Sequence, residues 1–277
     1  MMTRNSALDK FLLSRKFIVC IIVLQFILLP IATKGFRWEN IGDLIIYTLS
    51  HALIQGMYPY AWTFQIVSLV MLMLLVLWRV TMSRWFMFYV GGCYVLYAIV
   101  QNVAVTDKSG FSMVTVNVVM MLLVALLWMR EAWRGSSMLT FGNLNRRTAW
   151  LIPVALFCLW WPMDMMRGAE PDFSPIHLFA GGSQKGKRRM LRSVRIRSLK
   201  DTSLRLGTPV FLVLLLLSKE NIDLTLLRVT ALVGFIIGCY NMGNFATDAG
   251  FYLGLYHLLL VGISLYALLK SKRKNKI

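Results

Sequence analysis

Long uncharged apolar runs alternate with short polar segments along most of this chain. Most runs approach the ~20 residues that a helix needs to cross roughly 30 Å of hydrocarbon. They predict an all-α fold: a polytopic transmembrane helical bundle of about eight spans, in a single integral membrane domain covering residues 1–277. The runs are 17–33, 61–78, 85–105, 111–129, 149–163, 206–218, 224–242 and 249–269.

A ninth apolar segment, residues 44–60, is also uncharged, but it differs from the other runs. It carries His51 and Gln55, and helix-breaking Gly56 and Pro59 stand near its end. If this segment crossed the bilayer, every later loop would change side and the basic tail would lie opposite the N-terminus. We therefore predict that residues 44–60 are re-entrant or lie in the outer interface.

Positive charge is distributed unevenly over the loops that this topology creates. Five segments on one side carry seventeen of the thirty Lys and Arg: the N-terminal segment, 79–84, 130–148, 219–228 and the tail from residue 270. The other side carries four, apart from the segment 181–205. Because cytoplasmic loops are rich in Lys and Arg, we predict a multi-pass protein of the cell (plasma or inner) membrane with both termini cytoplasmic. The run 17–33 is expected to stay as an uncleaved first helix.

Composition agrees with a membrane location and changes how the net charge is interpreted. Apolar residues make up 58% of the chain and charged residues 15%, whereas soluble domains have roughly 45–50% and 25%. A net charge of +18 would suggest nucleic acid in a soluble protein. Here the positive residues stand between apolar runs, so the lipid bilayer is the expected partner and nucleic acid is not.

No metal or cofactor site is indicated by the sequence. The four cysteines lie one apiece in four apolar runs, with no C-x-x-C pair and no Cys/His cluster. Buried thiols that act as small hydrophobic groups are the simpler interpretation. We predict no cofactor and no metal.

Residues 181–205 do not fit the pattern. This segment holds nine Lys and Arg, a single acid and no aromatic residue, and it occupies the place of the first half of the short span 206–218. Three explanations remain open: a basic outer loop facing anionic headgroups, a cytoplasmic loop in a different topology, or a reading-frame artefact. The DNA around codons 175–210 decides between them, because an artefact requires a neighbouring frame that encodes an apolar stretch.

The candidate substrate-binding residues are Tyr47, His51, Gln55 and Asn117. The first three are spaced four apart and would form one polar stripe on a helix. Polar groups at membrane depth are costly unless they are paired or face water, which makes such a stripe a functional candidate. His51 is also a candidate for proton coupling. The alternative is an interfacial helix whose polar side meets headgroups.

Two further features lie near the C-terminus. Gly234, Gly238, Gly250 and Gly254 form two G-x-x-x-G pairs, which predict close helix packing in a hairpin of the last two spans. Asn241, Asn244, Asp248 and His257 invite a proton-relay interpretation, but residues 244–250 also have to form the turn of that hairpin.

The leading functional hypothesis is a small permease or channel-like protein for a neutral or weakly charged solute. The alternatives are an accessory, assembly or immunity protein that binds another membrane protein, and a membrane-bound enzyme acting on lipid. For the enzyme, Asp164, Asp172 and His177 are the available groups, at a spacing that matches no known mechanism. No H-E-x-x-H, G-x-S-x-G or Walker sequence occurs, so the sequence does not favour an enzyme.

Overall fold

The structure is a computed structural model that describes residues 7–35, 37–57, 60–141, 146–160, 207–218, 222–243 and 251–274. Within these ranges the chain is mostly helical, which confirms the predicted all-α class. The helices are α1 (Ala7–Leu12), α2 (Arg15–Ile27), α3 (Ile41–Ser50), α4 (Ala61–Leu77), α5 (Arg79–Val100), α6 (Thr115–Arg134), α7 (Arg146–Ala149), α8 (Leu151–Trp160), α10 (Thr208–Leu217), α11 (Leu224–Asn241) and α12 (Phe251–Lys274).

Four helices in the described ranges are long and apolar enough to cross a membrane: Arg79–Val100, Thr115–Arg134, Leu224–Asn241 and Gly254–Lys272. They correspond to the predicted runs 85–105, 111–129, 224–242 and 249–269. The runs 61–78 and 206–218 contain shorter apolar helices, Thr63–Leu77 and Thr208–Leu217. Crossings at the remaining runs stay predictions, and the basic segment 181–205 lies outside the described residues.

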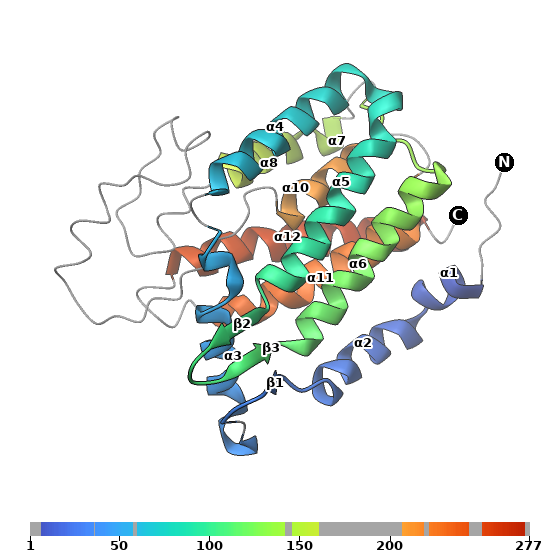
Figure 1. The fold of residues 1–277 in the computed structure, drawn as a ribbon. Coiled ribbons are helices and arrows are strands. Elements are labelled where there is room, and N and C mark those ends of the chain that lie inside the picture. Colours follow the sequence, from blue (N-terminus) through green and yellow to red (C-terminus); the bar gives the residue numbers. More distant parts are fainter. Residues whose placement is uncertain are drawn as a thin grey trace.

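Two pairs of long helices form the centre of the molecule. α5 packs along α6, and α11 packs along α12, while α10 contacts α8, α11 and α12 (Figure 1). Large apolar side chains fill the interior, and Phe86, Trp128 and Phe211 are fully buried there. The ring centroids of Trp128 and Phe211 lie 6.1 Å apart, which joins α6 to α10. α2 runs along the outside of α6 in Figure 1.

A small three-stranded antiparallel sheet was not predicted from the sequence. It is formed by β1 (Ile31–Ala32), β2 (Val103–Thr106) and β3 (Gly110–Met113), in the order β1-β3-β2. The predicted helices over 85–105 and 111–129 are therefore displaced along the chain away from the sheet: α5 runs from Arg79 to Val100, and α6 runs from Thr115 to Arg134. The residues of β2 are rich in β-branched side chains. The turn that follows them ends at Gly110, whose φ of +62° is a conformation that favours glycine.

The described part of the segment 44–60 lies against this sheet. α3 contacts β2 and β3, and the short 3-10 helix η2 (Leu53–Gln55) contacts α5 and β2. A second 3-10 helix, η1 (Trp38–Asn40), precedes α3. α3 ends at Ser50, so the polar stripe predicted from residue 47 to residue 55 does not lie on one continuous helix.

Candidate functional site

The sequence-predicted polar residues of 44–60 are largely engaged in local contacts. The rings of Tyr47 and His51 are stacked with centroids 4.2 Å apart. His51 Nδ1 lies 2.9 Å from Ser50 Oγ and 3.0 Å from the Tyr47 carbonyl oxygen, and Gln55 Nε2 donates to the Ser50 carbonyl. The Lys108 ammonium lies 4.9 Å from the Tyr47 ring centroid. These contacts close the C-terminal end of α3.

Asn117 stands apart from that group. It lies in the first turn of α6 and is half-buried. Among the described residues, no hydrogen bond or ring contact joins it to Tyr47, His51 or Gln55. The structure therefore brings three of the four candidates together, and their role in binding a substrate stays a prediction.

The glycines of α11 lie where α11 approaches α12 most closely. A Cβ atom on Gly234 would be 2.9 Å from Ser264 Oγ, and one on Gly238 would be 2.7 Å from Val261 Cγ2. Gly254 is buried near the start of α12, and Gly250 lies outside the described residues.

The polar residues near the end of α11 are only partly described. Asn241 donates to the carbonyl of Ile237 at 2.9 Å, and His257 is buried beside Tyr256. Asn244 and Asp248 lie outside the described residues, as do Asp172 and His177.

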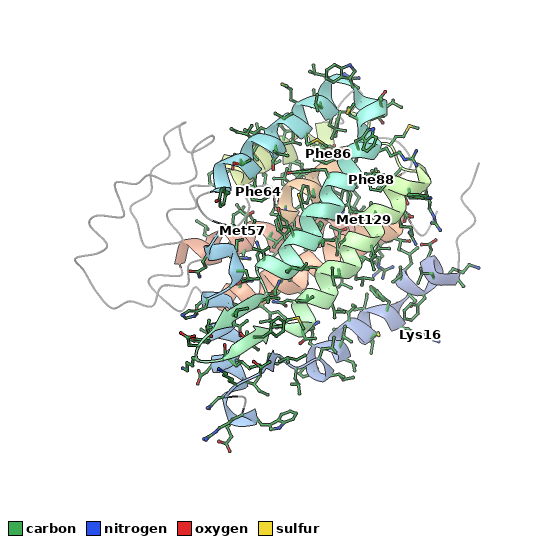
Figure 2. The ribbon with its side chains drawn as sticks, in the orientation of Figure 1. Lys16, Met57, Phe64, Phe86, Phe88 and Met129 are labelled. Atoms are coloured by element: carbon green, nitrogen blue, oxygen red, sulfur yellow. The ribbon has the colours of Figure 1, made fainter. Side chains whose placement is uncertain are left out.

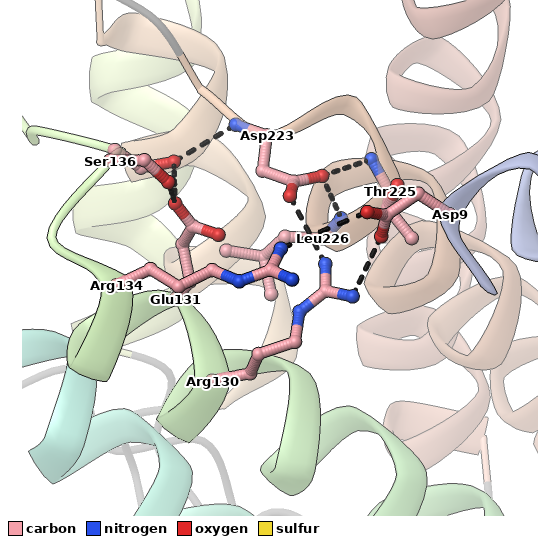
Figure 3. A network of polar contacts seen from close by, with 9 residues as sticks. Asp9, Arg130, Glu131, Arg134, Ser136, Asp223, Thr225 and Leu226 are labelled. Carbon is pink, nitrogen blue, oxygen red and sulfur yellow. Dashed lines mark hydrogen bonds and ion pairs between the residues drawn. The ribbon is translucent and has the colours of Figure 1, made fainter. Parts of the chain in front are cut away.

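An ionic network ties the N-terminal helix to the rest of the protein. We call Asp9, Arg130, Arg134 and Asp223 the Arg130 network (Figure 3). Arg130 donates to Asp9 at 2.6 Å and to Asp223 at 3.1 Å, and thereby links α1, α6 and the N-cap of α11. Arg134 reaches Asp9 at 3.7 Å. Asp223 also accepts from two backbone amides at the start of α11.

Beside the network, Glu131 is fully buried. One of its carboxylate oxygens accepts from the hydroxyls of Ser136 and Ser137. These two serines belong to the segment that follows α6. The contact therefore fixes this segment against the C-terminal turn of the helix.

The five segments that the charge pattern assigned to one side meet at one end of the bundle. Arg84 Nε donates to the Ala132 carbonyl at 2.7 Å, and Lys270 Nζ donates to the Leu216 carbonyl at 3.1 Å. The Arg228 guanidinium donates to the Leu13 carbonyl. Together with the Arg130 network, these contacts connect four of the segments directly, and the tail contacts the end of α10, where Ser218 Oγ donates to the Met138 carbonyl after α6. We call this the basic end.

A second group of polar side chains lies between the helices, away from the basic end. We call Gln65, Ser68, Tyr89, Cys93, Tyr94 and Thr208 the core polar cluster. Ser68 Oγ and the Tyr89 hydroxyl are hydrogen-bonded at 2.5 Å, and Cys93 lies one turn after Tyr89 on the same face of α5. The Tyr94 hydroxyl donates to Thr208 Oγ1 at 3.0 Å. Phe64, Phe86 and Phe88 mark α4 and α5, the two helices that carry most of this cluster, in Figure 2.

Helix lengths place Tyr94 and Thr208, two members of the core polar cluster, about 15 Å from the basic end. At 1.5 Å per residue, Tyr94 lies about 15 Å along α5 from Arg84 at the basic end. Thr208 begins α10, whose ten residues span about 15 Å before Ser218. Ser218 Oγ contacts the segment after α6 at the basic end, where it donates to the Met138 carbonyl. If the bundle crosses roughly 30 Å of hydrocarbon from the basic end, both estimates put the hydroxyls of Tyr94 and Thr208 about half-way across.

The core polar cluster was missed when the sequence was interpreted alone. Its members are distributed over three apolar runs, two in 61–78, three in 85–105 and one in 206–218, where aromatic and small polar residues are common. One signal was present, because Tyr89, Cys93 and Tyr97 recur every four residues within one span and so share a helix face. Only the pairing of α4 and α10 with α5 shows that their partners are polar as well.

Comparison with protein-family models, with curated proteins and with solved structures finds no match. Function is therefore inferred from the side chains described above.

Proposed function

We propose that the chain is a multi-pass protein of the cell membrane that carries a small uncharged solute across the bilayer. In this proposal it crosses about eight times, and both termini lie in the cytoplasm. The meeting of five Lys- and Arg-rich segments at one end supports this orientation, since cytoplasmic loops carry an excess of these residues. The opposite end carries Lys34 and Lys108, which lie next to each other across the sheet through the bond from Lys34 N to the Ser109 carbonyl.

Residues 44–60 do not cross in this topology. Their helices α3 and η2 lie on the sheet at the end opposite the basic end, and the sheet pairs backbone groups there. Such a segment is tolerated at membrane depth only where protein covers its backbone. We therefore place it in the outer interface or as a re-entrant segment.

The observation that carries the transport proposal is the core polar cluster. In a bilayer, hydroxyl and amide groups in the middle of a bundle are retained at a cost, and they usually mark a pathway or a site. Here they come from α4, α5 and α10, so a solute held among them would contact three separate elements. Rocking of one element against another would then expose it to either side.

The composition of the core polar cluster limits the charge of the solute. Its six residues offer hydroxyls, one amide and one thiol, and none of them is a carboxylate or a cation. A charged solute would leave its charge uncompensated in a low-dielectric interior. A small neutral molecule that hydrogen-bonds fits these groups.

Flux into proteoliposomes tests the proposal. We would follow entry of glycerol, erythritol, urea and malonamide by stopped-flow light scattering, with protein-free liposomes as the baseline. At least one of these solutes is expected to enter faster with the protein, and Tyr94→Phe is expected to lower that rate about tenfold, the equivalent of one lost hydrogen bond. Tyr240→Phe is the matched control, because its hydroxyl bonds Gln25 on α2, outside the cluster.

The competing hypothesis is an accessory protein of another membrane protein. It predicts flux no different from protein-free liposomes for all four solutes, together with stoichiometric co-purification of a second membrane protein. That combination would refute the transport proposal.

A further inference from the structure

Gln65 stands out within the core polar cluster because its hydrogen-bonding capacity is unused. Its side chain is 3% exposed, and neither its Nε2 nor its Oε1 has a hydrogen-bond partner among the described residues. The neighbouring Ser68 differs, since its hydroxyl bonds both the Phe64 carbonyl and Tyr89. The unmet capacity is therefore concentrated in one planar group.

The position of Gln65 follows from the pairing of α4 with α5. The two helices are antiparallel neighbours joined at Trp78, and Ser68 is level with Tyr89. Gln65 lies one turn before Ser68 on the same buried face of α4. It is therefore level with the turn that follows Tyr89 on α5, where Cys93 lies. The helix register therefore puts Gln65 level with Cys93 of the core polar cluster.

A buried, unpaired amide lowers stability, because each of its polar groups has lost water without gaining a partner. A leucine at this position would remove that penalty at similar volume. A buried amide at this position is therefore favourable only when another polar group forms hydrogen bonds with it. The complementary group has a donor beside an acceptor in one plane, so that two parallel hydrogen bonds form with Nε2 and Oε1.

We propose that Gln65 selects the solute, and that the solute carries a neutral planar amide-type group, with an N–H donor beside a carbonyl acceptor, as in a primary amide or urea. This inference rests on the proposed function, since it names the substrate class of the same site. Polyols of similar size lack the planar pair of donor and acceptor. A polyol can therefore form the two parallel hydrogen bonds with Gln65 only in a distorted geometry.

The same proteoliposomes separate the two proposals. Urea and malonamide are expected to enter at least about tenfold faster than glycerol and erythritol, their counterparts without an amide. Gln65→Leu is expected to lower urea and malonamide flux about tenfold or more, the loss of one to two hydrogen bonds. Because the substitution removes an unpaired buried group, the variant should melt no lower than the parent, which excludes misfolding as the cause. Gln25→Leu on α2 is the matched control and should keep parental flux.

Three outcomes would overturn the inference. Parental urea flux in Gln65→Leu would remove the role of this residue. Glycerol or erythritol flux that equals or exceeds amide flux would remove the substrate class, while the proposed function would stand if that flux still depends on Tyr94. Flux at the protein-free level for all four solutes would remove both proposals together.

Discussion

Loss of the Arg130 guanidinium is expected to destabilise the whole bundle, because this one side chain joins three elements. Arg130 bridges Asp9 on α1 and Asp223 at the start of α11, and its side chain is 18% exposed. The two carboxylates are 7% and 17% exposed. In Arg130→Met both would remain mostly buried, and of the Arg130 network only the more exposed Arg134, 3.7 Å from Asp9, would remain to balance their two negative charges.

The magnitude follows from this burial. Removing one partner of a buried ion pair costs about 3–5 kcal/mol. Partial exposure of Arg130 and Asp223 places the expectation near the lower limit, about 3 kcal/mol. For a chain of this size that corresponds to a fall in melting temperature of roughly 10 °C. Arg134→Met should cost less than about 1 kcal/mol, since Arg134 is 44% exposed and 3.7 Å from Asp9.

Thermal melts of purified protein in detergent, followed by size-exclusion chromatography with tryptophan fluorescence, provide the measurement. If unpaired charge is the cause, adding Asp9→Asn to Arg130→Met should recover part of the lost stability. A melting temperature for Arg130→Met that falls no further than that of Arg134→Met would refute the reasoning. Failure of Asp9→Asn to restore any stability would show that the excess negative charge left by the substitution is not the cause.

Three smaller predictions use the same melts. Gly238→Val should lower stability by about 1–3 kcal/mol, because the added Cβ would lie 2.7 Å from Val261 and force α11 from α12. Gly110→Ala should cost about 1 kcal/mol or more, since its φ is +62°, and faster hydrogen exchange in the hairpin should accompany the loss. Ser83→Ala should cost about 1–3 kcal/mol, because the buried Leu139 amide loses its acceptor at 2.8 Å, and Ser83→Thr should retain most of the stability. Unchanged melts would contradict each of these predictions.

The predicted site near Tyr47 shows that residue spacing indicates neighbours within a helix but does not indicate where the helix ends. The four-residue spacing correctly indicated that Tyr47 and His51 lie together, and their rings are stacked. It could not indicate that α3 ends at Ser50, because that depends on the sheet against which α3 packs. Beyond that point Gln55 bonds the backbone of Ser50 and caps the helix. The predicted polar stripe is therefore a helix end followed by a local turn, and not one face of a continuous helix.

The sheet, too, could not be predicted from the local sequence pattern. Val103 to Thr106 continue an apolar run, and apolarity alone does not distinguish the end of a helix from a buried strand. The strand forms because β3 pairs with it, and β3 also pairs with the distant β1, which brings Ile31 beside Met113. Backbone pairing over such a separation leaves no trace in the local pattern.

By itself, the sequence determined that the chain is mostly helical, which runs supply its long apolar helices, and which segments carry the positive charge. Hydropathy and charge are properties of single residues, and their effect on transfer between water and lipid is nearly additive along the chain. Only the tertiary structure decided which polar groups meet. Tyr94 and Thr208 are 114 residues apart, and Ser68 and Tyr89 are 21 apart. Their contacts, and the unpaired amide of Gln65 beside them, exist because helices pack in three dimensions.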